Sequence, residues 1–193
     1  MSERRFRLRP TNTFAAILVR NDESKLLSRL GHHHVVRADE FTSTLSIDPN
    51  DPSSLRFALS FPVFALVVDN PDDRRRVDLD PQVSSKDRAT TRENMLASSQ
   101  LDAQSYGNID FRVDGASVDP QGRWILNAAL IVKLHRHDFS FPVHLQWEPQ
   151  LRVQGRVDIT HDDLNLKPYR APMGTLQNDP RMSLIVDIDA APL

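Results

Sequence analysis

Strict alternation of apolar and polar residues is the feature of this chain that most constrains its fold. Between Leu151 and His161 the odd positions carry Leu, Val, Gly, Val, Ile and His, while the even positions carry Arg, Gln, Arg, Asp and Thr. Successive side chains of a strand point to opposite faces, so this segment has one apolar and one polar face. The pattern predicts an antiparallel sandwich or barrel, and a barrel interior is either packed or holds a ligand.

Four consecutive strands joined by short turns are predicted over residues 108–161. The first ends in the turn sequence Asp-Pro-Gln-Gly at 119–122, and the second covers 124–134. We place the next turn at 135–138, followed by an alternating strand over 139–147. Short links between alternating strands are typical of an antiparallel meander.

The first half of the chain repeats this organisation less regularly. Residues 41–48 and 55–61 alternate on either side of a turn at 48–52, and a final strand is predicted over 182–190. These segments add up to roughly eight or nine strands, with no visible domain boundary. We expect one all-β domain over residues 1–193, with the strands closed into a barrel that hides their edges.

One helix is predicted within this barrel, over residues 90–101. Thr90 and Glu93 have the spacing of a capping box. Before the helix, residues 69–85 are polar and contain Pro71 and Pro81 as breakers. We interpret that stretch as a long exposed loop.

The charge pattern argues against nucleic-acid binding. The formal net charge is −2, whereas a protein that relies on phosphate contacts is usually basic. Two arginine clusters stand out, and we interpret both as solvated surface: Arg4, Arg5, Arg7 and Arg9 at the start, and Arg74, Arg75 and Arg76 beside Asp72, Asp73 and Asp78.

The cysteine content and the N-terminal residues bear on redox chemistry and on the cellular compartment. It has no cysteine, which excludes a disulfide framework, a thiolate nucleophile and a Cys-ligated zinc. The opening residues MSERRFRLRP lack the apolar core of a signal peptide, and the apolar run 14–19 is much shorter than the ~20 residues of a membrane span. We therefore expect a cytoplasmic protein without stable membrane insertion.

Motifs typical of catalysis are missing from the sequence. It contains no G-x-S-x-G elbow, no glycine-rich phosphate loop, no dinucleotide fingerprint and no H-E-x-x-H helix. We therefore expect no catalytic residues and no cofactor.

Histidines are the exception that leaves alternatives open. His32 and His34 share a strand face, as do His135 and His137, so each pair could offer two imidazoles. Converging pairs would make a nitrogen-rich metal site. Alternatively, His32 and His34 lie at the start of a strand, and His135 and His137 lie in a turn, without a role in binding. In a third interpretation, one histidine and Tyr169 hydrogen-bond the polar end of an enclosed ligand.

The apolar strand faces would line such a ligand site, or else form a solid core. An eight-stranded barrel is just wide enough to be filled by side chains or to hold one small ligand. The candidate ligand-binding residues are Phe57, Leu59, Phe61, Phe111, Val113, Leu130, Val132, Phe141, Val143, Leu145, Val157 and Ile159, with His34 and Tyr169 as polar contacts.

Three segments, in order, resemble the YceI-like family of polyisoprenoid-binding proteins over residues 14–190. The segment HDDLNLKPYRAPMGTLQNDPRMSLIVDIDA is similar to the closing pattern of the family, in which Asp163, Leu164, Asn165 and Leu166 take the first places. The segment GHHHVVRADEFTSTLSIDPNDPSSLRFALSFPVFAL resembles its second strand, Asp-Pro turn and next strand. RENMLASSQLDAQSYGNIDFRVDGASV is similar to its helix, link and following strand.

The resemblance implies an extended, lipocalin-like antiparallel barrel with an elongated apolar tunnel. It also implies a long isoprenoid, quinone-like or fatty-amide ligand, and it makes a homodimer an expectation. Two departures are Asn165, where a glycine is common, and Asp39-Glu40-Phe41, where the family has glycine–aromatic pairs. Many relatives are exported, unlike the expectation for this chain.

We therefore expect a binding or carrier protein that does not react its ligand. The alternatives are a metal-binding protein or metal-dependent enzyme that uses the two histidine pairs, and a partner-binding or oligomerising protein with a solid barrel.

Overall fold

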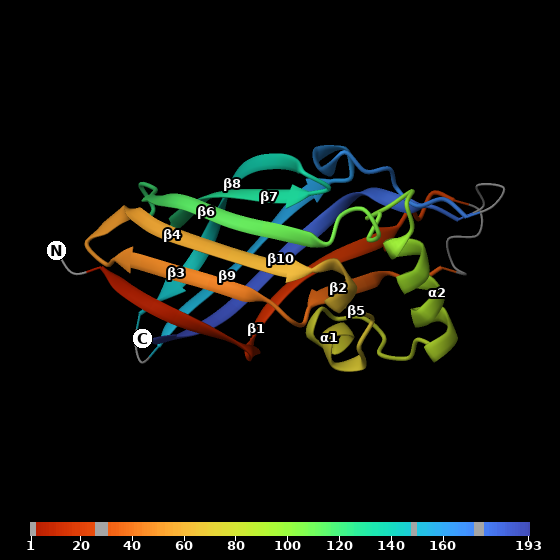
Figure 1. Cartoon of the computed structure of the whole chain (residues 1–193), viewed down its shortest axis with the longest axis horizontal. Coiled ribbons are helices and arrows are strands. Elements are labelled where there is room, and N and C mark those ends of the chain that lie inside the picture. Colours follow the sequence, from red (N-terminus) through yellow and green to blue (C-terminus); the bar gives the residue numbers. More distant parts are fainter. Residues whose placement is uncertain (1–2, 26–30, 148–149, 172–175) are drawn as a thin grey trace.

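Eight antiparallel strands close a barrel in the computed structural model, which describes residues 3–25, 31–147, 150–171 and 176–193 (Figure 1). The barrel strands are β1 (Arg4–Asn21), β3 (Thr42–Asp48), β4 (Asp51–Pro62), β6 (Asn108–Val118), β7 (Trp124–Val132), β8 (His135–Gln146), β9 (Leu151–Thr160) and β10 (Asn178–Pro192). They follow the order β10-β9-β8-β7-β6-β4-β3-β1, and β1 pairs again with β10. The predicted fold class is confirmed.

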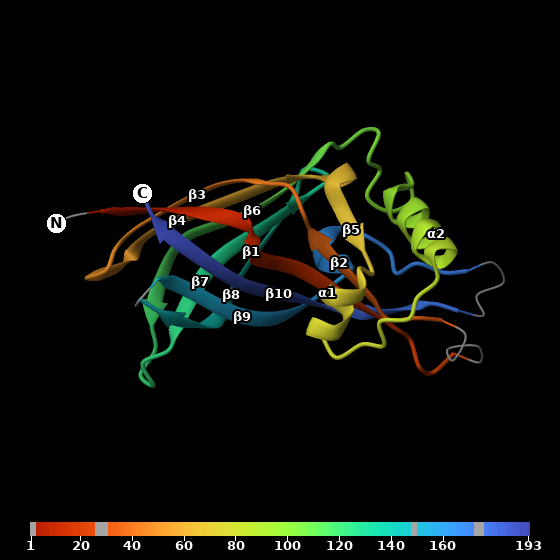
Figure 2. The same cartoon turned by 90° about the horizontal axis from the view of Figure 1, so that it is seen from below.

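Two short strands extend the sheet beside the barrel. The first part of β1 pairs with β3, whereas Ala16 to Val19 pair with β2 (His34–Ala38). Strand β5 (Leu66–Val68) then pairs with β2. Because β1 changes partners along its length, β2 and β5 cover one end of the barrel only, the end where α2 (Ser85–Leu96) lies, away from both termini (Figure 2).

The predicted meander is confirmed as β6 to β9, but the predicted turn at 135–138 is wrong. Val132 pairs with His135, so Lys133 and Leu134 alone make the turn, with φ of 50° and 64°. Residues 135–138 therefore begin β8. Two positive φ values are the geometry of the tightest hairpins, which usually select Asn or Gly. Positions 133 and 134 carry Lys and Leu instead of Asn or Gly, so the sequence contains no signal for this turn.

Replacing Leu134 by glycine is expected to stabilise the protein by about 1 kcal/mol. Leu134 is 85% exposed and has a left-handed backbone, which glycine adopts without strain. The free energy of unfolding in urea measures the change. Val118→Gly is the control, because Val118 is also exposed but lies in extended β6. A loss of stability in both variants would contradict this interpretation of the turn.

The stretch predicted as a loop contains helix α1 (Pro71–Arg76). The Asn70 side chain caps it by accepting a hydrogen bond from the Asp72 amide, and Pro71 occupies the first helical position. Asn before Pro, followed by acidic residues, is a helix-start signal. Pro71 therefore starts a helix within the stretch interpreted as a loop, and that interpretation is wrong for residues 71–76.

Helix α2 is real, but it begins and ends earlier than predicted. Ser84 caps it, because its Oγ accepts a hydrogen bond of 3.0 Å from the Asp87 amide. The chain leaves the helix after Leu96 rather than at residue 101. Met95 and Leu96 pack partly against the barrel core, as predicted. Neither α1 nor α2, the helices of the described ranges, has the length and apolar character needed to cross a membrane.

Two short 3-10 helices, Val63–Ala65 and Asp162–Leu164, complete the elements. The second ends at Asn165, whose φ is +54°. Asparagine is, after glycine, among the residues that best tolerate this conformation. The left-handed backbone at this position therefore suits both the glycine that is common in the YceI-like family and the asparagine of this chain.

Candidate functional site

A cavity of about 210 Å³ lies inside the half of the barrel next to α2. Its apolar wall comes from β1, β2, β4, β6, β7 and β10. Six of the predicted lining residues contribute to it: Phe57, Leu59, Phe61, Phe111, Leu130 and Val132. Ala15 and Ala38 also line it with side chains on the core face of the sheet, and their small size leaves the space open. The interior is thus hollow at this end.

The opposite half of the barrel is almost filled. It leaves a second cavity of only about 30 Å³, and the predicted residues Val113, Phe141 and Leu145 line it. Phe57 and Phe111 line both cavities, and their rings meet edge to face with centroids 5.9 Å apart. This aromatic pair lies where the two spaces adjoin. The described structure therefore shows a deep pocket in one half rather than an open tunnel along the barrel.

Three further predicted residues lie elsewhere in the wall. Val143, Val157 and Ile159 line neither cavity. Val143 and Ile159 are buried in the packed core, and Val157 is partly buried.

Polar groups gather at the end of the large cavity nearest to α2. The lining there includes His34, His161, Tyr169, Asn178 and, on or just after α2, Thr91, Asn94 and Gln100. The strand register places the histidines at one level: His34 pairs with Val19, Val19 with Met182, and Met182 with Ile159, just before His161. The cavity therefore has an apolar body and a polar end.

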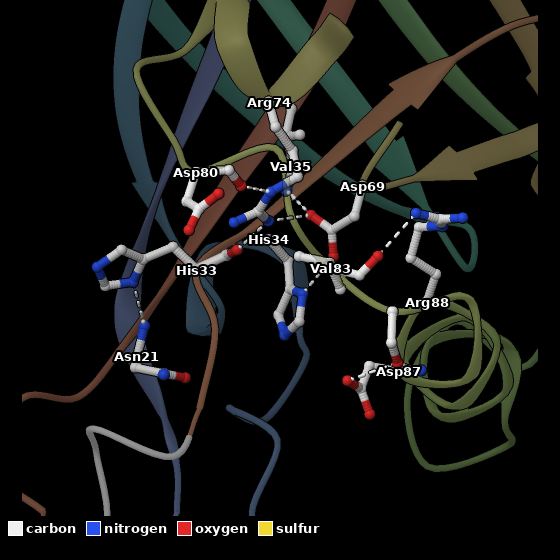
Figure 3. Close-up of polar contacts among 11 residues, drawn as sticks. Asn21, His33, His34, Val35, Asp69, Arg74, Asp80, Val83, Asp87 and Arg88 are labelled. Carbon is white, nitrogen blue, oxygen red and sulfur yellow. Dashed lines mark hydrogen bonds and ion pairs between the residues drawn. The ribbon is translucent and has the colours of Figure 1, made fainter. Parts of the chain in front are cut away.

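A buried charged network orients His34 (Figure 3). The Nδ1 atom of His34 lies 2.6 Å from Oδ2 of Asp69, which is fully buried after β5. The other oxygen of Asp69 accepts hydrogen bonds from the Val35 amide at 3.0 Å and from the Arg74 guanidinium at 2.7 Å. Arg74 also donates to the carbonyls of His33 and Asp80. The network ties β2, β5 and α1 together.

Asp69 is held ionised by these partners. Burial works to raise the pKa of Asp69, but the hydrogen bonds that its carboxylate accepts from His34, the Val35 amide and Arg74 outweigh burial and hold that pKa below its usual value. Asp69 has φ of +51°, so the backbone itself turns sharply to aim the carboxylate at β2.

The network corrects the interpretation of the second arginine cluster. Arg74 is 3% exposed and belongs to the core of the protein, not to its solvated surface. Arg75 is exposed as expected, and the side chain of Arg76 reaches Asp187 of β10 at 2.5 Å. The first cluster is exposed as predicted: Arg5, Arg7 and Arg9 alternate with buried Phe6 and Leu8 on β1, and Arg4 is exposed at the start of the strand.

The histidine pairs behave differently from one another. His34 opens β2, and the rings of His32 and His34 lie edge to face at 6.4 Å. His135 and His137 lie on β8 rather than in a turn, beside Asp163. Within the described ranges, no group of three or more His, Asp or Glu side chains is placed to hold a metal ion.

His161 lines the cavity but was not among the candidate residues predicted from the sequence. It lies 4% exposed at the polar end of the cavity, and its Nδ1 is 2.9 Å from the Pro180 carbonyl oxygen. The only signal was its place at the end of the apolar face of β9. Asp69 and Arg74 were also missed, because the residues around them were interpreted as a loop.

Acidification is expected to destabilise the protein through His161. Burial lowers the pKa of His161 below its usual value, so the unfolded chain binds a proton before the folded protein does. Stability is therefore full above about pH 6.5 and falls, by on the order of 1 kcal/mol per pH unit, as the pH drops towards the folded pKa. Urea unfolding at several pH values measures this slope. It should be shallower in His161→Asn, and an unchanged slope would contradict the assignment.

Comparisons with known proteins support the fold. The sequence matches no family model and no curated protein. Among solved structures, BcnA of Burkholderia cenocepacia is similar with a TM-score of 0.69 and 10% identity, over 96% of this chain and 100% of that one. A polyisoprenoid binding domain from Saccharophagus degradans, implicated in plant cell wall breakdown, is similar with a TM-score of 0.61 and 10% identity, over 100% of both chains.

A YceI protein of Campylobacter jejuni is similar as well, with a TM-score of 0.51 and 8% identity, over 82% of this chain and 84% of that one. Identities this low carry the fold and not the ligand. The resemblance that the sequence segments suggested is therefore confirmed at the level of architecture: the chain has the fold of the YceI proteins.

Proposed function

We propose that this protein binds a long apolar molecule in the barrel without reacting it. The observation that carries the proposal is the cavity of about 210 Å³, with aromatic and aliphatic walls and a polar end. A ligand would insert its apolar chain towards Phe57 and Phe111 and leave its head group beside α2. The polyisoprenoid binding domain that shares the fold supports an isoprenoid chain as the ligand. A quinone-like or fatty-amide chain has the same apolar character and is the alternative that we propose.

The energetics of such a site are sufficient. Each buried methylene contributes about 0.8 kcal/mol, so about eight of them contribute roughly 6 kcal/mol. That corresponds to a dissociation constant in the range of tens of micromolar before any contact of the head group. Affinity therefore requires no charge inside the barrel, and the apolar lining supplies none.

A carrier role fits the side chains around the cavity better than catalysis. Among the described lining residues, the ionisable side chains are His34, His161 and Tyr169, all at the polar end. Asp69 and Pro180 engage the two histidines through Nδ1, which orients the rings. The two histidine pairs considered for metal binding contact different parts of the fold, and no observation favours that alternative.

A fluorescence experiment tests the proposal. The dye N-phenyl-1-naphthylamine should brighten when it enters the cavity, and geranylgeraniol should displace it with a stoichiometry of one per chain. Heat-unfolded protein is the control for nonspecific binding. If neither the dye nor geranylgeraniol binds the folded protein, the barrel is not a ligand site and the proposal fails.

A further inference from the structure

The hydrogen positions on His34 follow from its partners. A carboxylate only accepts hydrogen bonds, so Nδ1 of His34 carries the hydrogen in its 2.6 Å contact with Asp69. In Figure 3 the second ring nitrogen lies on the side of the ring away from Asp69. Since His34 lines the cavity and Asp69 does not, that nitrogen, Nε2, belongs to the cavity side.

Arg74 supplies the counter-charge of Asp69 in this network. Arg74 lies 2.7 Å from Asp69, and the side chains of both are almost completely buried, so the negative charge already has its counter-charge. A second proton on His34 would place an uncompensated positive charge at the cavity wall, which is costly. In the uncharged ring, Nδ1 carries the hydrogen that bonds to Asp69, and Nε2 presents a lone pair.

His161 reaches the same state by a different route. Its Nδ1 lies 2.9 Å from the Pro180 carbonyl, which can only accept, so the hydrogen is on Nδ1. Burial lowers the pKa of His161, which favours the neutral ring. Within the described residues, the structure gives Nε2 of neither His34 nor His161 a hydrogen-bond partner. Two acceptors thus line the polar end of an apolar cavity.

We propose that His34 and His161 make the cavity selective for apolar chains whose head group donates a hydrogen bond, such as a hydroxyl or a primary amide. A head group that can only accept, such as an ether or ester, would meet two lone pairs and lose its bonds to water without replacement. This inference rests on the proposed function, because it concerns the head group of the same ligand.

Three probes with one chain separate the head group from the tail. We would measure displacement of N-phenyl-1-naphthylamine by dodecanol, dodecyl methyl ether and dodecane. The variants His34→Asn and His161→Asn keep an amide that can donate where Nδ1 does, and remove the Nε2 acceptor. Each should lower the preference for dodecanol over the ether by roughly threefold to tenfold. Dodecane affinity should stay within about twofold, since no hydrogen bond is involved.

His135→Asn is the matched control, because His135 is an exposed histidine on β8 that lines neither cavity. Its preference should equal that of the wild type. An unchanged preference in both cavity variants, with all probes still bound, would overturn the inference and leave the proposed function intact. Failure of the wild type to bind any probe would overturn the proposed function instead.

A second measurement does not depend on the variants. The histidine nitrogen NMR shifts of the wild-type protein report which ring nitrogen carries the hydrogen. The inference requires that His34 and His161 both have Nδ1 protonated and Nε2 unprotonated at neutral pH. The opposite tautomer, or a doubly protonated ring, at both positions would overturn it.

Discussion

Replacing Arg74 by methionine is expected to lower the free energy of unfolding by roughly 3–5 kcal/mol, the cost of leaving a buried charge unpaired. Arg74 neutralises Asp69 at 2.7 Å, and both side chains are almost completely buried. Methionine fills much of the same space but leaves the carboxylate with His34 and the Val35 amide alone. Urea unfolding at neutral pH measures the loss.

Two further variants isolate the cause of that loss. Arg75→Met changes the neighbouring exposed arginine and should alter stability by no more than about 0.5 kcal/mol. The double variant Arg74→Met with Asp69→Asn removes both charges and should recover part of the loss, and asparagine tolerates the positive φ of position 69. Equal stability of Arg74→Met and Arg75→Met would contradict a structural role for the network.

Filling the cavity should abolish binding while the fold persists. Ala38 of β2 is 3% exposed and lines the cavity, so phenylalanine at this position would occupy space that a ligand needs. If its ring displaces about four methylenes, the loss is roughly 3 kcal/mol, or about a hundredfold in the dissociation constant. Displacement of N-phenyl-1-naphthylamine by geranylgeraniol measures it.

Ala58→Phe is the matched control for this variant. Ala58 lies on β4 between Phe57 and Leu59, which both line the cavity, so its side chain points to the opposite face. This variant should bind as the wild type does. Undiminished binding by Ala38→Phe would show that the ligand lies outside the cavity.

Strand periodicity was sufficient to predict the architecture but not the site. Alternation with a period of two depends only on which face is buried, so β3, β4 and β6 to β10 could be located from the residues themselves. The 133–134 turn could not, because Lys and Leu adopt positive φ there under the constraint of the strands they join. Local propensity is overridden at that point by the pairing of β7 with β8.

The polar network could not be predicted for a different reason. His34, Asp69 and Arg74 meet only because β2 pairs with β5 and α1 follows directly, a tertiary arrangement with no sequence spacing of its own. The start of α1 was visible in Asn70 and Pro71, and recognising it would have placed Asp69 at a helix entry. The open and filled halves of the barrel depend on side-chain volumes in three dimensions, which periodicity does not contain.

Native mass spectrometry of the freshly purified protein, followed by organic extraction, tests the central claim most directly. We expect a stoichiometric apolar adduct in the wild type and in Ala58→Phe, released by extraction, and its loss in Ala38→Phe. A bare polypeptide mass for the wild type, together with no uptake of added geranylgeraniol, would contradict the claim that this barrel is a binding site.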